Sequence, residues 1–302
     1  MTVLVTGGNG FIGFHVVKKL DEKGIPVIVI DKKESSDNYG NLIKVDINDL
    51  DALSNIMANN DLQAVIHLVG FPNIGDCEKE PMTSFKLNTL STQNVVEAMR
   101  KTDVEKIVFA SSASVYGYQA KGKVSEEEMP RPDTIYGLHK LFSEQIIESY
   151  GEKYGIKFVI LRLFNVYGGD PTFRSDVVSL FIKQILNRRP LVLMGAKKFR
   201  DFIHVEDVAQ AFLMACNSGV ENKVFNIGSG VKITLEQLAN IFKNVIPNIQ
   251  VIKKNTPDDG TGIFADITLA KSLLAFNPRD PIEGLRKHIQ QYIAISLGVT
   301  LS

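Results

Sequence analysis

The chain has 302 residues, of which 44% are hydrophobic and 23% are charged. That length can bury a large core in one large or two modest domains. Lysine and arginine together number 34, as do aspartate and glutamate, so the net charge is zero. Because a neutral chain has no overall field that attracts nucleic acid or an anionic membrane, we expect neither partner, and local donors must hold any anionic ligand.

The two cysteines indicate a reducing compartment. Cys77 and Cys216 are far apart in the sequence, and neither has another Cys or His at metal-ligand spacing. This pattern argues against a disulfide framework and a zinc site, so we expect no metal. The first apolar run begins at Thr2, and no stretch approaches the ~20 apolar residues that span a membrane. These features predict a cytoplasmic protein.

Short β-branched runs alternate with amphipathic stretches through the first half of the chain. Strands are predicted at residues 3–5, 27–30, 42–45, 64–67, 106–110 and 158–161, and helices at 11–23, 50–58, 82–100 and 134–154. This order is typical of parallel strands joined by right-handed helical crossovers. Because the strand runs are almost continuously apolar, helices should cover both faces of the sheet. The predicted fold is α/β, a Rossmann-type doubly wound parallel sheet.

The alternation of apolar strand runs with amphipathic stretches becomes less regular after residue 164. Helices are predicted at 177–187 and 205–217, with a short apolar run at 191–194 and mixed short elements beyond. We expect a Rossmann domain over residues 1–164 and a smaller mixed α/β lobe over 165–302, with residues 201–228 returning to the first sheet. Because the chain carries no repeat and no long linker, the two parts should pack closely around a cleft.

A glycine motif follows the first predicted strand and opens the first predicted helix. Gly7, Gly10 and Gly13 have GxxGxxG spacing, and Phe11 and Ile12 lie between the last two. Glycine permits a tight turn, a close approach of pyrophosphate to backbone N–H groups, and close packing of helix on strand. A glycine-rich turn that merely connects two elements is the alternative. The position at the first strand-to-helix turn favours a dinucleotide site.

An acidic residue ends the second predicted strand. The carboxylate of Asp31 can accept hydrogen bonds from both ribose hydroxyls of NAD and would repel the 2′-phosphate of NADP, so NAD is the favoured cofactor. The alternative is that Asp31 only begins a surface turn, and Lys32 could partly neutralise a phosphate. Asp46 and Ile47, just after the third strand, could hold the adenine, or Asp46 could be a helix N-cap.

A phenol and an ammonium lie on one face of a predicted helix. Tyr136 and Lys140 are four residues apart, and Tyr136 is the only one of eight tyrosines followed by a lysine at that distance. A nearby positive charge, reinforced by oxidised nicotinamide, would lower the pKa of the phenol and make it a usable base. In a lysine-rich chain this spacing also occurs by chance.

A serine cluster leaves the fifth predicted strand at its carboxyl end, the edge where open parallel sheets bind ligands. Ser111, Ser112 and Ser114 belong to it. A serine there can relay a proton or hydrogen-bond the oxygen that changes oxidation state. Ordinary turn chemistry is the alternative reading of such a cluster.

The combined motifs resemble the NAD-dependent epimerase/dehydratase family of extended short-chain dehydrogenases/reductases. Segments in family order are 6–13, Asp31, 46–47, 67–70, Asn88, 111–117, 136–140, 161–168 and 200–207. The resemblance covers nearly the whole chain. It implies that residues 1–164 bind NAD and that residues 165–302 bind a nucleotide sugar.

The resemblance also implies roles for individual residues. Tyr136 would be the base, Lys140 would hold the nicotinamide ribose and tune Tyr136, and Ser112 would assist at the sugar hydroxyl. The cofactor would further contact Leu68, Val69, Gly70, Asn88 and Ser111, and the substrate would contact Ser112, Ser114, Tyr136, Asn165, Arg200 and Asp259. For Arg200 there is a physical case too, because a neutral protein that binds a dianion needs a guanidinium at the phosphates. The alternative for Arg200 is a surface ion pair with Asp201.

Two positions discriminate among the reactions of the family. Relatives that dehydrate sugars carry an Asp-Glu pair where this chain has Ala113 and Ser114, and related decarboxylases carry Glu at the Ser114 position. Without that acid-base pair, elimination of water is disfavoured. The resemblance therefore implies epimerisation at the sugar C4, with UDP-glucose and UDP-galactose as the leading substrates. The alternatives are an NAD-dependent dehydrogenase or reductase of a sugar or small alcohol, and a non-catalytic NAD-sensing protein.

The chain also departs from the epimerase pattern. Thr256 stands where an arginine usually contacts the diphosphate, and Lys253 or Lys254 could substitute for it. Ile263 replaces a bulkier residue at the sugar pocket, so N-acetylated or uronic sugars and other nucleotides remain alternatives. Family resemblance further implies a homodimer through the predicted helices that begin at Met82 and Thr134.

Overall fold

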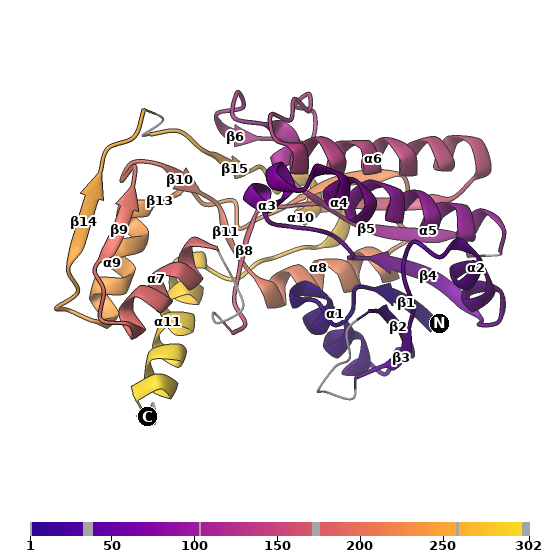
Figure 1. The fold of residues 1–302 in the computed structure, drawn as a ribbon, viewed down its shortest axis with the longest axis horizontal. Coiled ribbons are helices and arrows are strands. Elements are labelled where there is room, and N and C mark those ends of the chain that lie inside the picture. The colour runs from indigo at the N-terminus through magenta and orange to yellow at the C-terminus, as the bar shows by residue number, and fades with distance from the viewer. Residues whose placement is uncertain (1, 33–38, 103, 171–175, 258–259, 298–302) are drawn as a thin grey trace.

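The computed structural model describes residues 2–32, 39–102, 104–170, 176–257 and 260–297 (Figure 1). Its central feature is a seven-stranded sheet in which every pairing is parallel. The strand order is β3 (Asn41–Lys44), β2 (Val27–Asp31), β1 (Thr2–Thr6), β4 (Leu62–His67), β5 (Lys106–Ser112), β7 (Lys157–Leu163) and β12 (Lys223–Ile227). The order reverses between β1 and β4.

Helices cover both faces of this sheet (Figure 1). One layer contains α1 (Phe11–Asp21), α8 (Val205–Asn217) and α10 (Thr268–Leu274), and the other contains α2 (Leu50–Ala58), α5 (Ser91–Arg100) and α6 (Ile135–Tyr154). Successive strand side chains enter opposite cores: Val3 and Val5 pack under α1 and α8, whereas Leu4 packs under α2 and α5. The predicted Rossmann-type doubly wound fold is confirmed.

One predicted helix is interrupted. Instead of a single helix over 82–100, the chain forms α4 (Pro81–Phe85), a π-helical turn over Lys86–Leu90, and α5. The backbone oxygen of Asn88, inside the π turn, accepts hydrogen bonds from the hydroxyls of Thr92 at 3.1 Å and Ser143 at 2.5 Å. A π turn inserts one residue into the helical ladder, and here it turns Asn88 toward the buried interior.

The smaller lobe is mixed α/β with a core of its own. Its helices are α7 (Val177–Leu186), α9 (Leu235–Val245) and α11 (Pro281–Leu297), and its strands are β8 (Asn165–Tyr167), β9 (Leu191–Met194), β10 (Phe199–Arg200), β11 (Phe202–His204), β13 (Ile233–Thr234) and β14 (Val251–Lys254). Figure 1 shows this lobe beside the main sheet, at the end opposite the N-terminus. A further two-stranded pair, β6 (Gly122–Val124) with β15 (Ile263–Ala265), joins the chain after β5 to the chain near the C-terminus.

Among the described residues, no helix has the length and apolar character needed to cross a membrane. Over the same residues, no three His, Cys, Asp or Glu side chains gather as a metal site would require.

Candidate active site

The carboxyl ends of the central strands meet at one edge of the sheet. β1 ends at Thr6, β2 at Asp31, β4 at His67 and β5 at Ser112. Because ligands of doubly wound sheets bind outside this edge, where the strand order reverses, the loops after β1 and β4 define the site.

The glycine loop fits closely against the loop after β4. Gly7 has a φ of +73°, and a Cβ added there would lie 2.9 Å from the backbone nitrogen of Val69. A Cβ on Gly13 would lie 2.1 Å from the backbone oxygen of Gly7. Any side chain at these two positions would therefore force the loop and helix apart. Gly10 is the N-cap of α1, and it has no side chain that could cap the first backbone N–H groups of the helix.

Two carboxylates lie beyond the ends of β2 and β3. Asp31 accepts a hydrogen bond from the backbone nitrogen of Asn9 at 3.0 Å, which ties the glycine loop to β2. Asp46 forms a 2.8 Å ion pair with Lys32, and this pairing lowers the pKa of Asp46. The N-cap of α2 is Asp49, not Asp46, so the N-cap alternative for Asp46 is wrong. Ile47 is buried.

Tyr136 and Lys140 lie on the first turns of α6, beneath the loop after β5. Thr134 caps this helix by accepting from the backbone nitrogen of Gly137 at 3.0 Å. The Nζ of Lys140 is buried, donates to the backbone oxygen of Ala110 at 2.8 Å, and lies 4.8 Å from the centroid of the Phe109 ring. Lys140 is therefore held by the end of β5.

Burial dominates the pKa values of this pair. It raises the pKa of Tyr136 to about 12, and hydrogen bonding with Ser112 lowers it by less. Burial also lowers the pKa of Lys140 to about 8, against the opposing effect of Glu144. The expected lowering of the Tyr136 pKa is therefore not found in the protein alone, because burial of the phenol outweighs the opposing effects.

The three serines divide between two environments. Ser112 Oγ donates to Ser114 Oγ and accepts from the backbone nitrogen of Ser114, both at 3.2 Å, and thereby caps the short 3₁₀ turn Ala113–Tyr116. Ser111 instead donates its hydroxyl to the buried carboxylate of Glu144. Adjacent residues of a strand point to opposite faces, so only Ser112 shares the side of Tyr136.

Asn88 holds the loop that follows β4. Its Oδ1 accepts from the backbone nitrogen of Phe71 at 2.9 Å, and its Nδ2 donates to the backbone oxygen of Phe71 at 3.2 Å. A Cβ added to Gly70 would lie 3.0 Å from Asn88 Oδ1 and 3.5 Å from Lys140 Nζ. Leu68 and Val69 pack against the two opposite cores of the sheet. The structure thus brings this loop, Asn88 and Lys140 together.

A buried ionic network supports the serine turn from below. Arg162 donates from Nη2 to Glu144 Oε2 at 2.7 Å and from Nε to Glu144 Oε1 at 3.1 Å. Its third contact is Nη1 to the Tyr116 hydroxyl at 3.0 Å, and that hydroxyl donates to Asn226 Oδ1 at 2.8 Å. The network connects β5, α6, β7 and β12 directly behind the catalytic candidates.

A cavity of about 360 Å³ opens in the smaller lobe and contains two of the predicted substrate contacts, Asn165 and Arg200. Its other lining residues are Val166, Asp176, Val177, Met194, Lys198, Phe202 and Leu235. Asp201 is fully buried and accepts from the backbone nitrogens of Ser229 and Gly230, so it is not a surface partner for Arg200. Asp259 lies outside the described residues.

Comparison with known proteins identifies the family of the chain. The model of the NAD dependent epimerase/dehydratase family matches residues 3–228. The chain belongs to this family. The resemblance inferred from the motifs is therefore confirmed, and the protein is an enzyme of a family that depends on NAD.

Individual relatives of this family member match nearly the whole chain. A putative UDP-glucose 4-epimerase of Methanocaldococcus jannaschii is 37% identical over 297 residues, covering 94% of this chain and 96% of the relative. The structure of a UDP-glucose 4-epimerase of Thermotoga maritima with UDP-glucose matches with a TM-score of 0.91 and 32% identity. The match covers 98% of this chain and 100% of the Thermotoga chain. The structure of a UDP-N-acetylglucosamine 4-epimerase of Methanobrevibacter ruminantium, in complex with UDP-N-acetylmuramic acid, matches with a TM-score of 0.88 and 30% identity. The match covers 97% of this chain and 98% of the Methanobrevibacter chain.

The sheet edge of this epimerase/dehydratase family member fits NAD. The glycine loop leaves no room for side chains against Val69, which suits a pyrophosphate held by backbone nitrogens at the start of α1. Asp31, at the end of β2, has the position and charge to accept from ribose hydroxyls. Lys140 Nζ and Asn88 lie against Gly70, in the same loop after β4 that Gly7 approaches at Val69.

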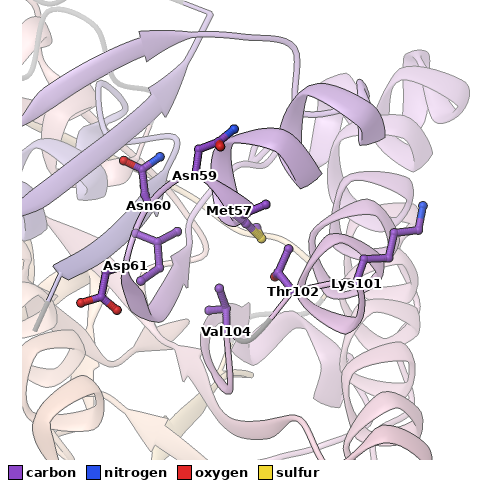
Figure 2. A pocket seen from close by; sticks show the side chains of 9 residues that line it. Met57, Asn59, Asn60, Asp61, Lys101, Thr102 and Val104 are labelled. Carbon is purple, nitrogen blue, oxygen red and sulfur yellow. The ribbon is translucent and has the colours of Figure 1, made fainter.

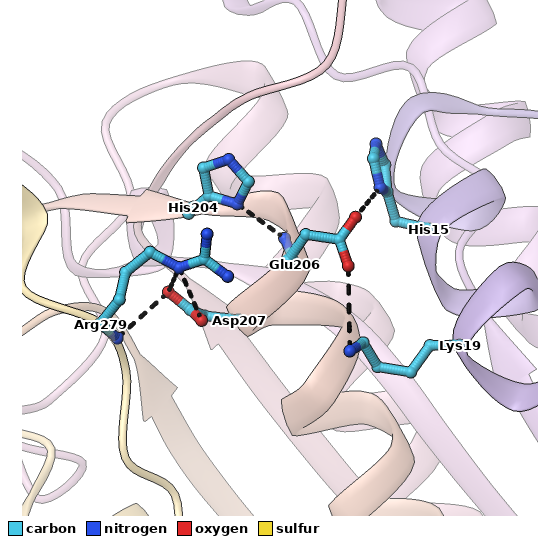
Figure 3. Close-up of polar contacts among 6 residues, drawn as sticks. All are labelled: His15, Lys19, His204, Glu206, Asp207 and Arg279. Atoms are coloured by element: carbon cyan, nitrogen blue, oxygen red, sulfur yellow. Dashed lines mark hydrogen bonds and ion pairs between the residues drawn. The ribbon is translucent and has the colours of Figure 1, made fainter. Parts of the chain in front are cut away.

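Histidines near the site have structural contacts. His204 caps α8 by accepting from the backbone nitrogen of Glu206 at 3.2 Å, and Glu206 pairs with His15 on α1 at 2.5 Å (Figure 3). Asp207 accepts from Arg279 Nε at 2.9 Å, as the same view shows. His67 lies between the hydroxyls of Thr6 at 2.6 Å and Thr92 at 3.2 Å. The contacts of Glu206 and Asp207 join α8 to α1 and to the chain before α11.

A larger cavity, about 520 Å³, lies where α2 and α5 end and β4 begins (Figure 2). That is the amino edge of the sheet, opposite the site. Its polar side chains terminate helices: Asn59 and Asn60 donate to backbone oxygens of α2, and Thr102 donates to that of Ala98. We assign it no role in the reaction.

Proposed function

We propose that this protein is an NAD-dependent UDP-glucose 4-epimerase, which inverts C4 of the sugar through a transient 4-keto sugar. The observation that carries the proposal is the cluster of Tyr136, Lys140 and Ser112 beside the glycine loop, with Ala113 and Ser114 in place of an elimination pair. Support comes from relatives named as UDP-glucose 4-epimerases over nearly the full chain.

We propose that Tyr136 accepts the proton of the C4 hydroxyl and returns it after the sugar has turned. When bound, NAD would supply a hydride acceptor and a positive ring that favours ionisation of the phenol. Ser112, which hydrogen-bonds with Tyr136, would orient the sugar oxygen. Lys140, fixed on Ala110, would hold the nicotinamide ribose, and Asn88 would keep the adjoining loop in place.

The remaining contacts divide by region. We propose that residues 1–164, with residues 201–228, form the NAD-binding domain, and that the rest of 165–302 forms the substrate lobe. In the first, the pyrophosphate would contact Gly7, Gly10, Phe11, Ile12 and Gly13, the adenosine would contact Asp31, Asp46 and Ile47, and the nicotinamide end would contact Leu68, Val69, Gly70, Asn88 and Ser111. In the second, Asn165, Arg200 and Asp259 would hold the nucleotide, while Ser114 would contact the sugar.

We also propose a homodimer in the cytoplasm. Four apolar side chains stand exposed on adjoining helical segments, namely Met82, Phe85, Leu90 and Phe142, with Met82 67% exposed. Contiguous exposed apolar side chains on a helical pair favour association with a second copy. Sedimentation should report two copies for the wild type and one for Met82→Glu combined with Phe85→Glu. The buried free thiols of Cys77 and Cys216 suit a reducing compartment.

The reaction can be tested directly. Purified protein incubated with UDP-galactose should yield UDP-glucose, while absorbance at the NADH wavelength stays flat, because the hydride returns to the same sugar. Steady growth of NADH would show a net dehydrogenase instead. A protein that converts UDP-N-acetylgalactosamine but neither simple hexose would move the assignment to N-acetylated sugars.

A further inference from the structure

The Ser84 hydroxyl, on α4, lies between two other buried polar side chains. Its Oγ accepts from Asn88 Nδ2 at 3.1 Å and lies 2.8 Å from Nδ1 of His139. His139 belongs to α6, between Tyr136 and Lys140 in the sequence. The three residues are 0%, 1% and 7% exposed in chain order, so their polar atoms must find partners within the protein. Ser84 thus connects the π turn to the helix that carries the proposed base.

The backbone of Phe71 determines the orientation of the Asn88 amide. The N–H of Phe71 can only donate, so it faces Asn88 Oδ1 at 2.9 Å, and the oxygen of Phe71 can only accept, so it faces Asn88 Nδ2 at 3.2 Å. The second N–H of the amide then points to Ser84, whose oxygen accepts it. This orientation leaves the hydroxyl proton of Ser84 to be donated elsewhere.

His139 is the strongest acceptor for that proton. Its Nδ1 lies at hydrogen-bond distance from Ser84 Oγ, whereas the other neighbour of this hydroxyl is the sulfur of Cys77, a weak acceptor. Burial lowers the pKa of His139, which keeps the ring neutral. A neutral ring that accepts at Nδ1 has its proton on Nε2. The hydrogen bonds thus run in one direction, from Asn88 through Ser84 to His139.

The first member of this chain of hydrogen bonds borders the loop after β4. A Cβ added to Gly70 would lie 3.0 Å from Asn88 Oδ1 and 3.5 Å from Lys140 Nζ. If the amide of Asn88 rotated by half a turn, its NH2 group would face the N–H of Phe71, and both hydrogen bonds to the loop would be lost. The position of Gly70 beside Lys140 therefore depends on the orientation of Asn88.

We propose that His139 is a positioning residue of the active site. By accepting the Ser84 proton, the neutral ring holds the Asn88 amide in one orientation, and the amide holds Gly70 beside Lys140. His139 acts through Ser84 and Asn88, not on the sugar. The inference rests on the proposed function, which assigns the nicotinamide end of NAD to this loop.

Two substitutions at position 139 separate positioning from packing. Asparagine can place its amide oxygen close to the present position of Nδ1, whereas leucine fills the space of the ring but accepts no hydrogen bond. We expect His139→Leu to lower kcat for UDP-galactose, per bound NAD, roughly tenfold, and His139→Asn to keep it within about twofold of the wild type. KM should not change, because the smaller lobe would hold the nucleotide. The temperature of unfolding should follow the opposite order, because asparagine leaves a larger cavity than leucine.

Substitutions on α4 test the same connection from its other side. Ser84→Ala should lower kcat as much as His139→Leu, and the double variant should lose no more than either single variant, because each already breaks the chain of hydrogen bonds. The matched control is Thr83→Val, which removes a neighbouring hydroxyl that contacts Glu80 Oε2 at 3.2 Å and should keep the wild-type kcat. Nitrogen NMR of histidine-labelled protein should show the proton of His139 on Nε2, and Ser84→Ala should shift the Nδ1 resonance.

A wild-type kcat in His139→Leu, an equal loss of kcat in His139→Asn and His139→Leu, or a proton on Nδ1 of His139 would overturn the inference. If the wild type interconverts no UDP-sugar, the same variants are compared by the rate at which bound NADH leaves the holoenzyme in excess NAD. A rate that rises in His139→Leu and returns in His139→Asn would mean that the proposed function fails while this inference stands. A rate that is equal in all variants would overturn the inference as well.

Discussion

The sheet edge and the lobe cavity each contain a lysine, but in opposite surroundings. Lys140 is buried against Ala110 and Phe109, and burial lowers its pKa to about 8. Lys198 is only partly buried and shares its cavity with Arg200. Burial in the first environment disfavours the charged form of a lysine, whereas the second is partly open to solvent, which favours the charged form. This contrast agrees with the proposed function, which assigns the chemistry to the sheet edge and recognition of the nucleotide to the smaller lobe.

Removing the phenol oxygen should have the largest effect, and only on chemistry. We expect Tyr136→Phe to lower kcat by roughly a hundredfold to ten-thousandfold, because the C4 proton loses its acceptor. NAD released from the denatured variant, quantified by chromatography, should match the wild type, since the glycine loop and Asp31 are untouched. Near-normal kcat in this variant would remove Tyr136 from the role of base.

Breaking the buried ion pair should have the largest effect on stability. Glu144→Gln leaves the Arg162 guanidinium buried without its charge partner, which should cost about 3–5 kcal/mol of unfolding free energy. Urea denaturation measures the loss. The control is Glu283→Gln, which breaks an exposed pair with Arg286 and should leave the midpoint unchanged. Equal midpoints for both variants would mean that the network does not stabilise the sheet edge.

Acid should weaken the sheet edge through His67. Burial lowers the pKa of His67 to about 3, so below pH 6.5 the unfolded chain binds a proton that the folded chain does not. Its contribution to stability is complete above pH 6.5 and is lost as the pH falls toward 3, by about 1.4 kcal/mol per pH unit.

His67→Gln isolates this effect. In urea titrations from pH 7 to 4, the variant should lose stability less steeply with falling pH than the wild type, by that same amount per unit. Above pH 7 the two curves should run parallel, whatever their offset. Identical slopes at low pH would show that His67 takes up its proton in the folded state.

The sequence predicted the sheet and the Tyr136–Lys140 pair well, because both depend on regular spacing. Side-chain partners were harder to predict: Ser111 and Ser112 are adjacent in sequence but face opposite sides of β5, and only tertiary structure shows that Ser111 donates to Glu144. The N-cap alternative at Asp46 failed because Asp49 caps α2. The position of Lys198 on the lobe cavity was not predicted, because the adjoining strand β10 has only two residues and shows no periodic pattern, although the alternation Lys198, Arg200, Phe202 could have indicated it.

Two helix caps give the smallest effects and the sharpest contrast between the regions. Thr134 caps α6, which carries Tyr136 two residues later, and Thr234 caps α9 in the smaller lobe through a capping box with Gln237. Replacing either threonine with alanine should cost about 1 kcal/mol of unfolding free energy. Only Thr134→Ala should also lower kcat, because fraying the first turn of α6 displaces the phenol. A kcat loss in Thr234→Ala that matches that of Thr134→Ala would mean that the lobe and the sheet edge act as one unit, and it would contradict the proposed division between chemistry and recognition.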